Sequence, residues 1–175
     1  MNRKGKIQVF TGEGKGKTTA AMGLALKAVC ENRKVFVVQF LKPPDSSGEH
    51  FSAKAFPFLL TILPMGRKGF IRKSRTDSSD TARAKRALEE ARNAMTGGGY
   101  DVIILDEVNV AVYMGLIDPS ELLEFMDSLP DILELILTGR YALPEVMIRA
   151  DEVYEAKNIK HPFDIGVAAK EGIEY

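Results

Sequence analysis

A run of small and cationic residues near the start of the chain has the composition of a phosphate-binding loop. Residues 11–19 read TGEGKGKTT, close to the pattern G-x-x-x-x-G-K-[ST]. In such loops backbone N–H groups cradle phosphate oxygens, the lysine neutralises phosphate charge and the next hydroxyl binds Mg²⁺. Lys17 and Thr18 hold these positions here. The pattern requires its first glycine at position 11, where the chain has Thr11, so the loop begins one residue late at Gly12.

The whole loop is expected to hold the triphosphate of a nucleotide. Its glycines carry no Cβ and allow the backbone to approach phosphate closely, and a second lysine adds positive charge. The alternative is a glycine-rich turn with solvated lysines, but a predicted strand before the loop and a helix after it favour the phosphate site. The predicted nucleotide-binding residues are Gly12, Glu13, Gly14, Lys15, Gly16, Lys17, Thr18 and Thr19.

Two adjacent acids are the predicted metal partners of this loop. Asp106 and Glu107 follow four apolar residues in the stretch DVIILDE. A buried strand that ends in acids is typical of the metal-supporting side of a nucleotide site. We expect Glu107 and Thr18 to be direct Mg²⁺ ligands, and Asp106 to contact the ligands rather than the metal. The sequence leaves open which acid contacts the metal, and two surface acids at a strand end are the alternative.

The elements that must position these residues alternate between strand and helix. Short apolar runs predict strands at residues 6–10, 34–40, 58–63, 101–107, 133–139 and 151–156. Helical spacing of apolar residues predicts helices at residues 18–31, about 80–96, 119–129 and 143–149. Between them, residues 41–58 and 64–79 are predicted loops, with Ser78 and Ser79 as caps of the helix that follows. This order predicts one α/β domain over residues 1–175, a RecA-like phosphate-loop fold whose mostly parallel sheet has helices on both faces.

Bulk composition narrows the class of protein. The chain has 175 residues, of which 45% are hydrophobic and 27% charged, as in soluble globular domains. Its formal net charge of zero creates no field for nucleic acid or an acidic membrane. We therefore expect neither nucleic acid nor a membrane surface as a partner. The first residues, MNRKGKIQVFTG, hold no long apolar run, and no other run approaches membrane-spanning length, so a cytoplasmic protein is expected. The single cysteine, Cys30, is expected to be a small core residue.

The two motifs predict binding of a nucleoside triphosphate and Mg²⁺ but leave the reaction open. Attack at the γ-phosphorus would make the protein a kinase or hydrolase that releases ADP. Attack at C5′ of the ribose would release the whole triphosphate, whose charge the same cationic loop would stabilise. A non-catalytic protein that binds the nucleotide is the third possibility.

Several stretches beyond the loop resemble the ATP:corrinoid adenosyltransferases, a phosphate-loop family that makes adenosylcobalamin. They are TGEGKGKTTAAMGLALKA (11–28), VVQFLK (37–42), LDEVNVAVYMGLI (105–117), LTGRYALPEVMIRADEVYEAK (137–157) and KHPFDIGVAAKEGIEY (160–175). The last two are the most specific, because other phosphate-loop ATPases have nothing like them. The family has the same shortened loop, so the late first glycine is expected to be a family trait.

The resemblance implies a particular reaction. ATP would bind with its terminal phosphate in the loop, and the Co(I) of a reduced corrinoid would attack C5′ and release tripolyphosphate, in adenosylcobalamin biosynthesis or salvage. Lys17 would act in catalysis by countering charge, and Phe70 by pressing on the lower face of the corrinoid. An external reductant, such as a flavoprotein, and a homodimer are also implied. The non-catalytic alternative then extends to a protein that binds the corrinoid as well as the nucleotide. Arg140 and His161 lie in matching stretches without a defined role.

The chain departs from the family where the corrinoid is expected. The family commonly has a tryptophan two positions after the phenylalanine, but this chain has Arg72 there and no tryptophan at all. Residues 67–75 carry five basic side chains and no acid, which also suits a solvated charged face. We expect a weaker aromatic wall, or one built from Phe51, Phe56 or Phe58. His50 is expected to be solvent-exposed in its loop.

Overall fold

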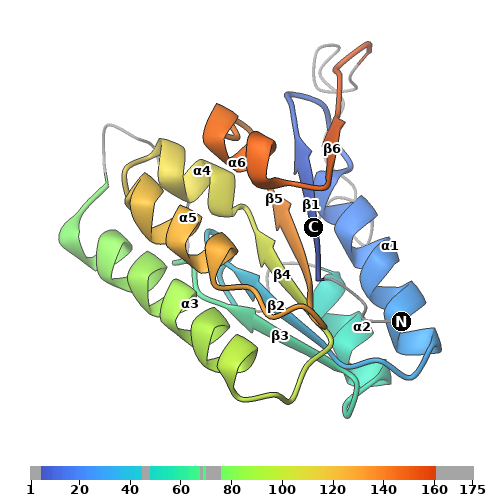
Figure 1. Cartoon of the computed structure of the whole chain (residues 1–175). Coiled ribbons are helices and arrows are strands. Elements are labelled where there is room, and N and C mark those ends of the chain that lie inside the picture. The colour runs from blue at the N-terminus through green and yellow to red at the C-terminus, as the bar shows by residue number, and fades with distance from the viewer. Residues whose placement is uncertain (1–4, 45–47, 68, 70–75, 161–175) are drawn as a thin grey trace.

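A single parallel sheet forms the centre of the protein. The structure is a computed structural model that describes residues 5–44, 48–67, 69 and 76–160. Within these residues the strands have the order β3-β2-β4-β5-β1-β6, and every neighbouring pair is parallel (Figure 1). The strands are β1 (Lys6–Thr11), β2 (Val35–Gln39), β3 (Leu60–Pro64), β4 (Val102–Asp106), β5 (Glu134–Thr138) and β6 (Glu152–Glu155). The predicted α/β class and parallel sheet are confirmed.

Helices cover both faces of this sheet, as predicted. They are α1 (Lys17–Cys30), α2 (Glu49–Ala55), α3 (Ser78–Thr96), α4 (Val108–Tyr113), α5 (Pro119–Asp127) and α6 (Pro144–Arg149). Helices α1 and α2 lie on one face, and α3 to α6 lie on the other (Figure 1). No helix in the described part of the chain has the length and apolar character needed to cross a membrane.

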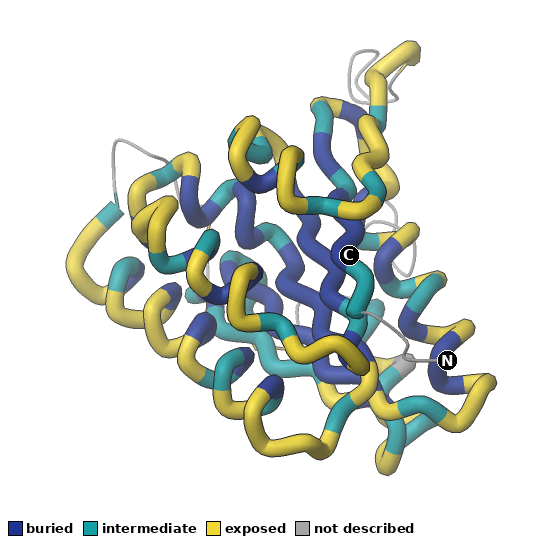
Figure 2. The backbone as a smooth tube through the Cα atoms, in the orientation of Figure 1, coloured by how far each residue is buried: buried dark blue, intermediate teal, exposed yellow. Residues whose placement is uncertain are grey.

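The core consists of two apolar clusters separated by the sheet. In β4, Val102 and Ile104 belong to the cluster beneath α1, whereas Ile103 and Leu105 belong to the cluster beneath α3 to α6. Successive side chains of a strand point to opposite faces, so a strand covered on both sides must be apolar throughout. The buried strands accordingly form a continuous band through the centre of the molecule (Figure 2).

Two helices were missing from the sequence prediction. Helix α2 lies within the predicted loop 41–58, and α4 directly follows the acidic strand β4. They have 7 and 6 residues, too few for a stable helix on intrinsic propensity alone. Helix α4 buries Ala111 and Val112 in the core, and α2 packs Ala53 on the opposite cluster. Tertiary contacts therefore explain why these two segments are helical.

Two smaller expectations were wrong. Helix α3 is capped by Asp77 rather than by Ser78 or Ser79: the Asp77 carboxylate accepts hydrogen bonds from the N–H groups of Ser79 and Asp80. Cys30 is exposed rather than buried. It is the last residue of α1, where the face that buries Ala28 and Val29 has already turned past it.

Candidate active site

The predicted phosphate loop joins β1 to α1 at the carboxyl edge of the sheet. Ligands of open parallel sheets bind outside this edge. Gly12 and Gly16 have φ values of 93° and 96°, a left-handed conformation that favours glycine. The strand–loop–helix order predicted for residues 11–19 is present. Nucleotide binding by these residues stays a prediction.

Two loop glycines are also required by the protein's own packing. A Cβ on Gly12 would lie 2.5 Å from the carbonyl oxygen of Ala156, and one on Gly14 would lie 2.8 Å from the backbone of Lys157. The N–H of Gly14 donates to the Ala156 carbonyl at 2.7 Å, and the Ala156 N–H donates to the Thr11 carbonyl at 2.8 Å. The chain that leaves β6 therefore holds one wall of the loop, and the Gly14 amide is engaged there.

Lys17 lies inside the loop. Its side chain is buried, and its Nζ donates to the carbonyl oxygens of Gly12, at 2.7 Å, and Gly14. Burial lowers the pKa of Lys17, and the carboxylate of Glu107 partly opposes this shift. The loop thus holds an ammonium group against its own carbonyl oxygens. The neutralisation of phosphate charge by Lys17 stays a prediction.

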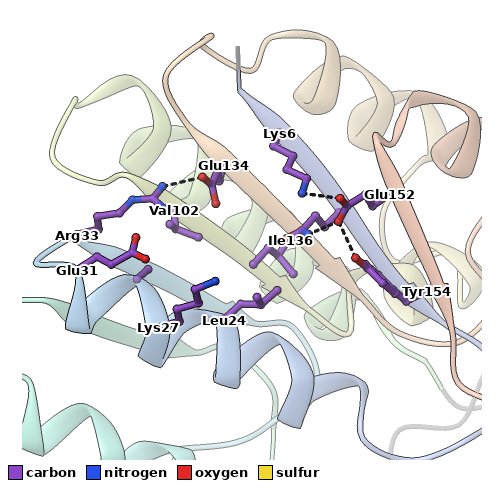
Figure 3. A pocket seen from close by; sticks show the side chains of 12 residues that line it. Lys6, Leu24, Lys27, Glu31, Arg33, Val102, Glu134, Ile136, Glu152 and Tyr154 are labelled. Carbon is purple, nitrogen blue, oxygen red and sulfur yellow. Dashed lines mark hydrogen bonds and ion pairs between the residues drawn. The ribbon is translucent and has the colours of Figure 1, made fainter. Parts of the chain in front are cut away.

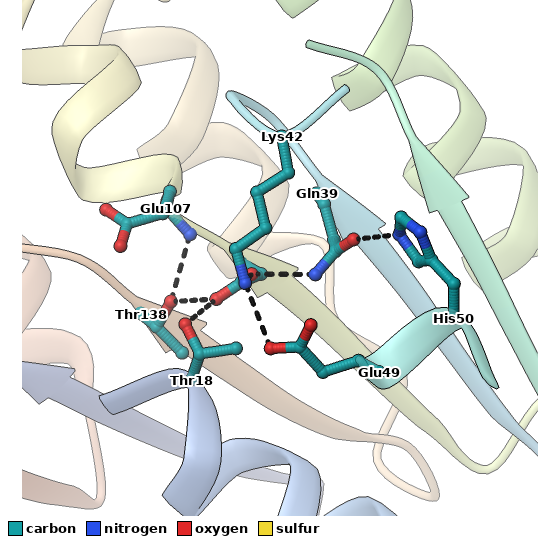
Figure 4. A network of polar contacts seen from close by, with 8 residues as sticks. Thr18, Gln39, Lys42, Glu49, His50, Glu107 and Thr138 are labelled. Atoms are coloured by element: carbon teal, nitrogen blue, oxygen red, sulfur yellow. Dashed lines mark hydrogen bonds and ion pairs between the residues drawn. The ribbon is translucent and has the colours of Figure 1, made fainter. Parts of the chain in front are cut away.

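Asp106 is the centre of a buried polar network at the same edge. Its Oδ1 accepts hydrogen bonds from the hydroxyls of Thr18, at 2.8 Å, and Thr138, at 2.7 Å. Its Oδ2 accepts from Gln39 Nε2 at 3.1 Å and lies 3.2 Å from Lys42 Nζ (Figure 4). An ionised carboxylate offers about four acceptor positions. All four are engaged, and the side chain is only 1% exposed.

Glu107 lies beside this network in a conformation that turns the chain sharply. Its φ is 64°, and it is the residue from which α4 begins. Its N–H donates to the Thr138 hydroxyl at 2.9 Å. Burial raises the pKa of Glu107, Asp106 adds to the rise, and Lys17 opposes it. A nearby cation would therefore favour the ionised form of this carboxylate.

Several members of the network were missed by sequence reasoning. Thr138, Gln39, Lys42 and Glu49 had no predicted role, and His50 was expected to be exposed. His50 is instead half-buried on α2, with Nε2 2.7 Å from Oε1 of Gln39. The signal in the sequence was the glutamine in VVQFLK, since a polar residue inside an apolar strand needs a hydrogen-bond partner.

Other predicted site residues have different positions. Phe70, His161 and Arg72 lie outside the described residues. Arg140 reaches the loop, with NH1 3.0 Å from Oε2 of Glu13. Tyr141, with a φ of 64°, contacts Tyr113: the ring centroids are 4.1 Å apart and the ring planes are tilted by 33°.

Phe51, Phe56 and Phe58 are the residues expected to form an alternative aromatic wall beneath the corrinoid. The positions of two of them do not support this expectation. Phe56 and Phe58 precede β3, whose first residue, Leu60, pairs with Val35 at the amino end of β2. Asp106 pairs with Gln39 at the opposite end of that strand. Phe56 and Phe58 therefore lie at the edge of the sheet that faces away from the phosphate loop.

A hollow of about 550 Å³ lies at that amino edge, between α1 and the starts of β1, β4, β5 and β6 (Figure 3). Four of its charged side chains form ion pairs: Lys6 lies 2.6 Å from Glu152, and Arg33 lies 3.1 Å from Glu134. Glu152 also accepts hydrogen bonds from Gln8 and Tyr154. Since these groups satisfy one another at the wrong edge for a nucleotide, we assign them a structural role.

Comparison with a solved structure bears on the fold alone. A KaiC-like protein from Pyrococcus horikoshii OT3 matches with a TM-score of 0.59 at 13% sequence identity, covering 89% of this chain and 74% of that one. The likeness confirms the predicted RecA-like phosphate-loop fold.

Sequence comparison identifies the family. The chain matches the family described as ATP:corrinoid adenosyltransferase BtuR/CobO/CobP over residues 3–175. It is 34% identical to a corrinoid adenosyltransferase of Escherichia coli K12 over 175 residues, covering 100% of this chain and 88% of the relative. A Pseudomonas aeruginosa relative of the same description is 32% identical, covering 99% and 85%. One from Salmonella typhimurium LT2 is 33% identical, covering 100% and 88%. The chain therefore belongs to the ATP:corrinoid adenosyltransferases, a family of enzymes whose substrates are ATP and a corrinoid.

Proposed function

We propose that this enzyme transfers the 5′-deoxyadenosyl group of ATP to the cobalt of a reduced Co(I) corrinoid and releases tripolyphosphate. The electron pair of the substrate's cobalt forms the new cobalt–carbon bond at C5′. The bond between C5′ and its oxygen breaks, and its electrons leave with the triphosphate. The observation that carries this proposal, beyond family membership, is the buried Lys17 ammonium within the loop, beside the Asp106 network.

The chemistry places few demands on the protein's own side chains. The corrinoid substrate supplies the nucleophile, so no residue needs to act as a general base. The remaining tasks are to orient C5′ toward the cobalt and to stabilise negative charge on the departing triphosphate. Lys17 and the loop amides other than that of Gly14 perform the second task from a partly buried position, where electrostatic interactions are less screened than in water.

The site also suits Mg²⁺, which prefers oxygen ligands and is commonly bound by one or two protein groups together with phosphates and water. The Thr18 hydroxyl donates its proton to Asp106, which leaves its oxygen lone pairs for a cation. Asp106 has no acceptor position left, whereas Glu107 keeps its carboxylate outside that network. We therefore assign Thr18 and Glu107 as the protein ligands of Mg²⁺, with Asp106 acting through Thr18. When bound, Mg²⁺ would neutralise triphosphate charge.

The corrinoid side of the proposal rests on the resemblance. Phe70 remains our candidate for the residue beneath the corrinoid. An external reductant such as a flavoprotein, a homodimeric assembly and a cytoplasmic location complete the proposal, and family membership is their support.

An anaerobic assay tests the reaction directly. The protein is incubated with ATP, Mg²⁺ and chemically reduced corrinoid, and tripolyphosphate is separated from ADP and orthophosphate. We expect tripolyphosphate in equal amount to the adenosylated corrinoid, and little ATP turnover when corrinoid is omitted. ADP as the main product would contradict adenosyl transfer and would indicate phosphoryl transfer instead.

A further inference from the structure

We infer that helix α2 positions Asp106 through two hydrogen-bonded arms, His50–Gln39 and Glu49–Lys42, and so controls the Mg²⁺–nucleotide site. This inference rests on the proposed function and deepens it, because it assigns positioning roles to residues far from Asp106 in the sequence. Both arms begin in the first turn of α2 and both end on the same atom, Oδ2 of Asp106 (Figure 4).

The direction of the hydrogen bonds in the first arm follows from charge. An ionised carboxylate can only accept, so Gln39 must present Nε2 to Asp106. This fixes the Gln39 amide with its Oε1 toward His50. Since that oxygen can also only accept, Nε2 of His50 must carry a proton and donate it across the 2.7 Å contact. Gln39 is fully buried, so water has no access to replace either bond.

The second arm is an ion pair extended by one further carboxylate. Lys42 Nζ lies 3.2 Å from Oδ2 of Asp106 and 3.1 Å from Oε1 of Glu49. The side chains of Lys42 and Glu49 are 26% and 24% exposed. Lys42 is thus the cation that compensates the buried charge of Asp106, and Glu49 holds that cation in place from α2.

The two arms matter because they occupy one carboxylate oxygen while the site uses the other. With Oδ2 held by Gln39 and Lys42, the carboxylate cannot rotate, and Oδ1 stays directed at Thr18. Hydrogen-bonded partners of this kind orient metal ligands and tune their affinity. Helix α2 has only 7 residues, too few for stability without such contacts. Docking of α2 and binding of the Mg²⁺ complex should therefore favour each other.

Substitutions at His50 test the first arm. His50→Leu removes the donor, whereas His50→Gln places an amide N–H at a similar reach. Lys54→Leu is the matched control, because Lys54 is exposed on the same helix and contacts the Phe51 ring rather than the network. Affinity for ATP is measured by calorimetry with Mg²⁺ and with a chelator, and amide hydrogen exchange of α2 is followed in both conditions.

We expect His50→Leu to weaken ATP binding about tenfold in Mg²⁺ and much less in chelator. His50→Gln should restore most of this loss, and Lys54→Leu should behave as the unsubstituted protein. MgATP should slow exchange in α2 of the unsubstituted protein, and this protection should be lost in His50→Leu.

If His50→Leu weakens ATP binding equally with and without Mg²⁺, or does not weaken it, the role of the first arm is overturned. Should His50→Leu fail to fold, Lys42→Gln tests the second arm by the same measurements and with the same expected Mg²⁺ dependence. ATP binding by the unsubstituted protein is measured first. If it shows no dependence on Mg²⁺, the metal site in the proposed function fails before any variant is considered, so the two failures are distinct.

Discussion

The hydroxyl of Thr138 joins Asp106 and Glu107, the two acids of the site. It donates to Oδ1 of Asp106 at 2.7 Å and accepts from the N–H of Glu107 at 2.9 Å. A hydroxyl can serve both acids because it is donor and acceptor at once. Strand β5 therefore contacts both acids, although Asp106 is the last residue of β4 and Glu107 caps the start of α4.

Replacing Thr138 with valine tests this connection. Valine has nearly the same shape but leaves the Glu107 N–H and one Asp106 acceptor position without their partner. We expect a loss of about 1–3 kcal/mol in the free energy of unfolding, the cost of unsatisfied buried groups, together with weaker MgATP binding. Urea unfolding and nucleotide titration measure the two effects. Thr138→Ser keeps the hydroxyl and should be close to the unsubstituted protein. Equal stability of the valine variant would show that the connection is not needed.

Alanine is expected to have opposite effects on stability at Gly14, in the loop, and at Gly23, in α1. Gly14→Ala would place a Cβ 2.8 Å from the Lys157 backbone, and we expect about 1–3 kcal/mol of destabilisation from overpacking. Gly23 lies in α1, and a Cβ added there would meet nothing within 4 Å. Gly23→Ala should therefore raise the free energy of unfolding by about 0.5–1 kcal/mol, because glycine is less favourable in a helix. Chemical denaturation measures both, and a harmless Gly14→Ala would contradict the close packing of the loop.

Acid sensitivity is predicted for the edge strand β6. Hydrogen bonds from Lys6, Tyr154 and Gln8 lower the pKa of Glu152 from 4.5 to about 2. A carboxyl group whose pKa falls on folding stabilises the protein above its unfolded pKa. That contribution is lost as the pH falls from about 4.5 towards 2. Glu152→Gln should lower the thermal midpoint at about pH 7 and weaken its dependence on pH within this window.

The measurement is thermal unfolding between about pH 2 and pH 7, the range over which this carboxyl group changes its charge. Glu155→Gln is a suitable control on the same strand, because Glu155 is exposed and its ion pair with Lys157 spans 3.8 Å. Parallel pH profiles for Glu152→Gln and the unsubstituted protein would rule out the proposed contribution.

Phe70 is the residue through which the corrinoid proposal can be tested most simply. A lost aromatic contact of about 1.5 kcal/mol corresponds to about a tenfold change in affinity. Phe70→Ala should raise the KM for corrinoid by about this factor and leave ATP affinity unchanged. Phe58→Ala should change neither, because Phe58 precedes the amino end of β3. Steady-state kinetics with each substrate varied separately distinguishes these outcomes, and unchanged corrinoid kinetics would remove Phe70 from the site.

Contiguous features of this protein were predictable from sequence. The strand, glycine-rich loop and helix could be predicted because the groups expected to bind phosphate there are neighbours in the sequence, including the adjacent side chains Lys17 and Thr18. The parallel sheet followed from apolar runs such as residues 101–107, since a strand covered on both faces must be apolar throughout. The error at Cys30 arose because helical periodicity alone does not show where a buried face ends.

The surroundings of Asp106 were decided only by the tertiary structure. Gln39 and Thr138 are separated from Asp106 by 67 and 32 positions in the chain. They meet because the sheet places β2 and β5 on either side of β4, with all three carboxyl ends at one edge. The short helix α2 then adds His50 and Glu49. Local spacing carries no information about strand order, so the loop could be predicted from the sequence, but the groups that orient its acid could not.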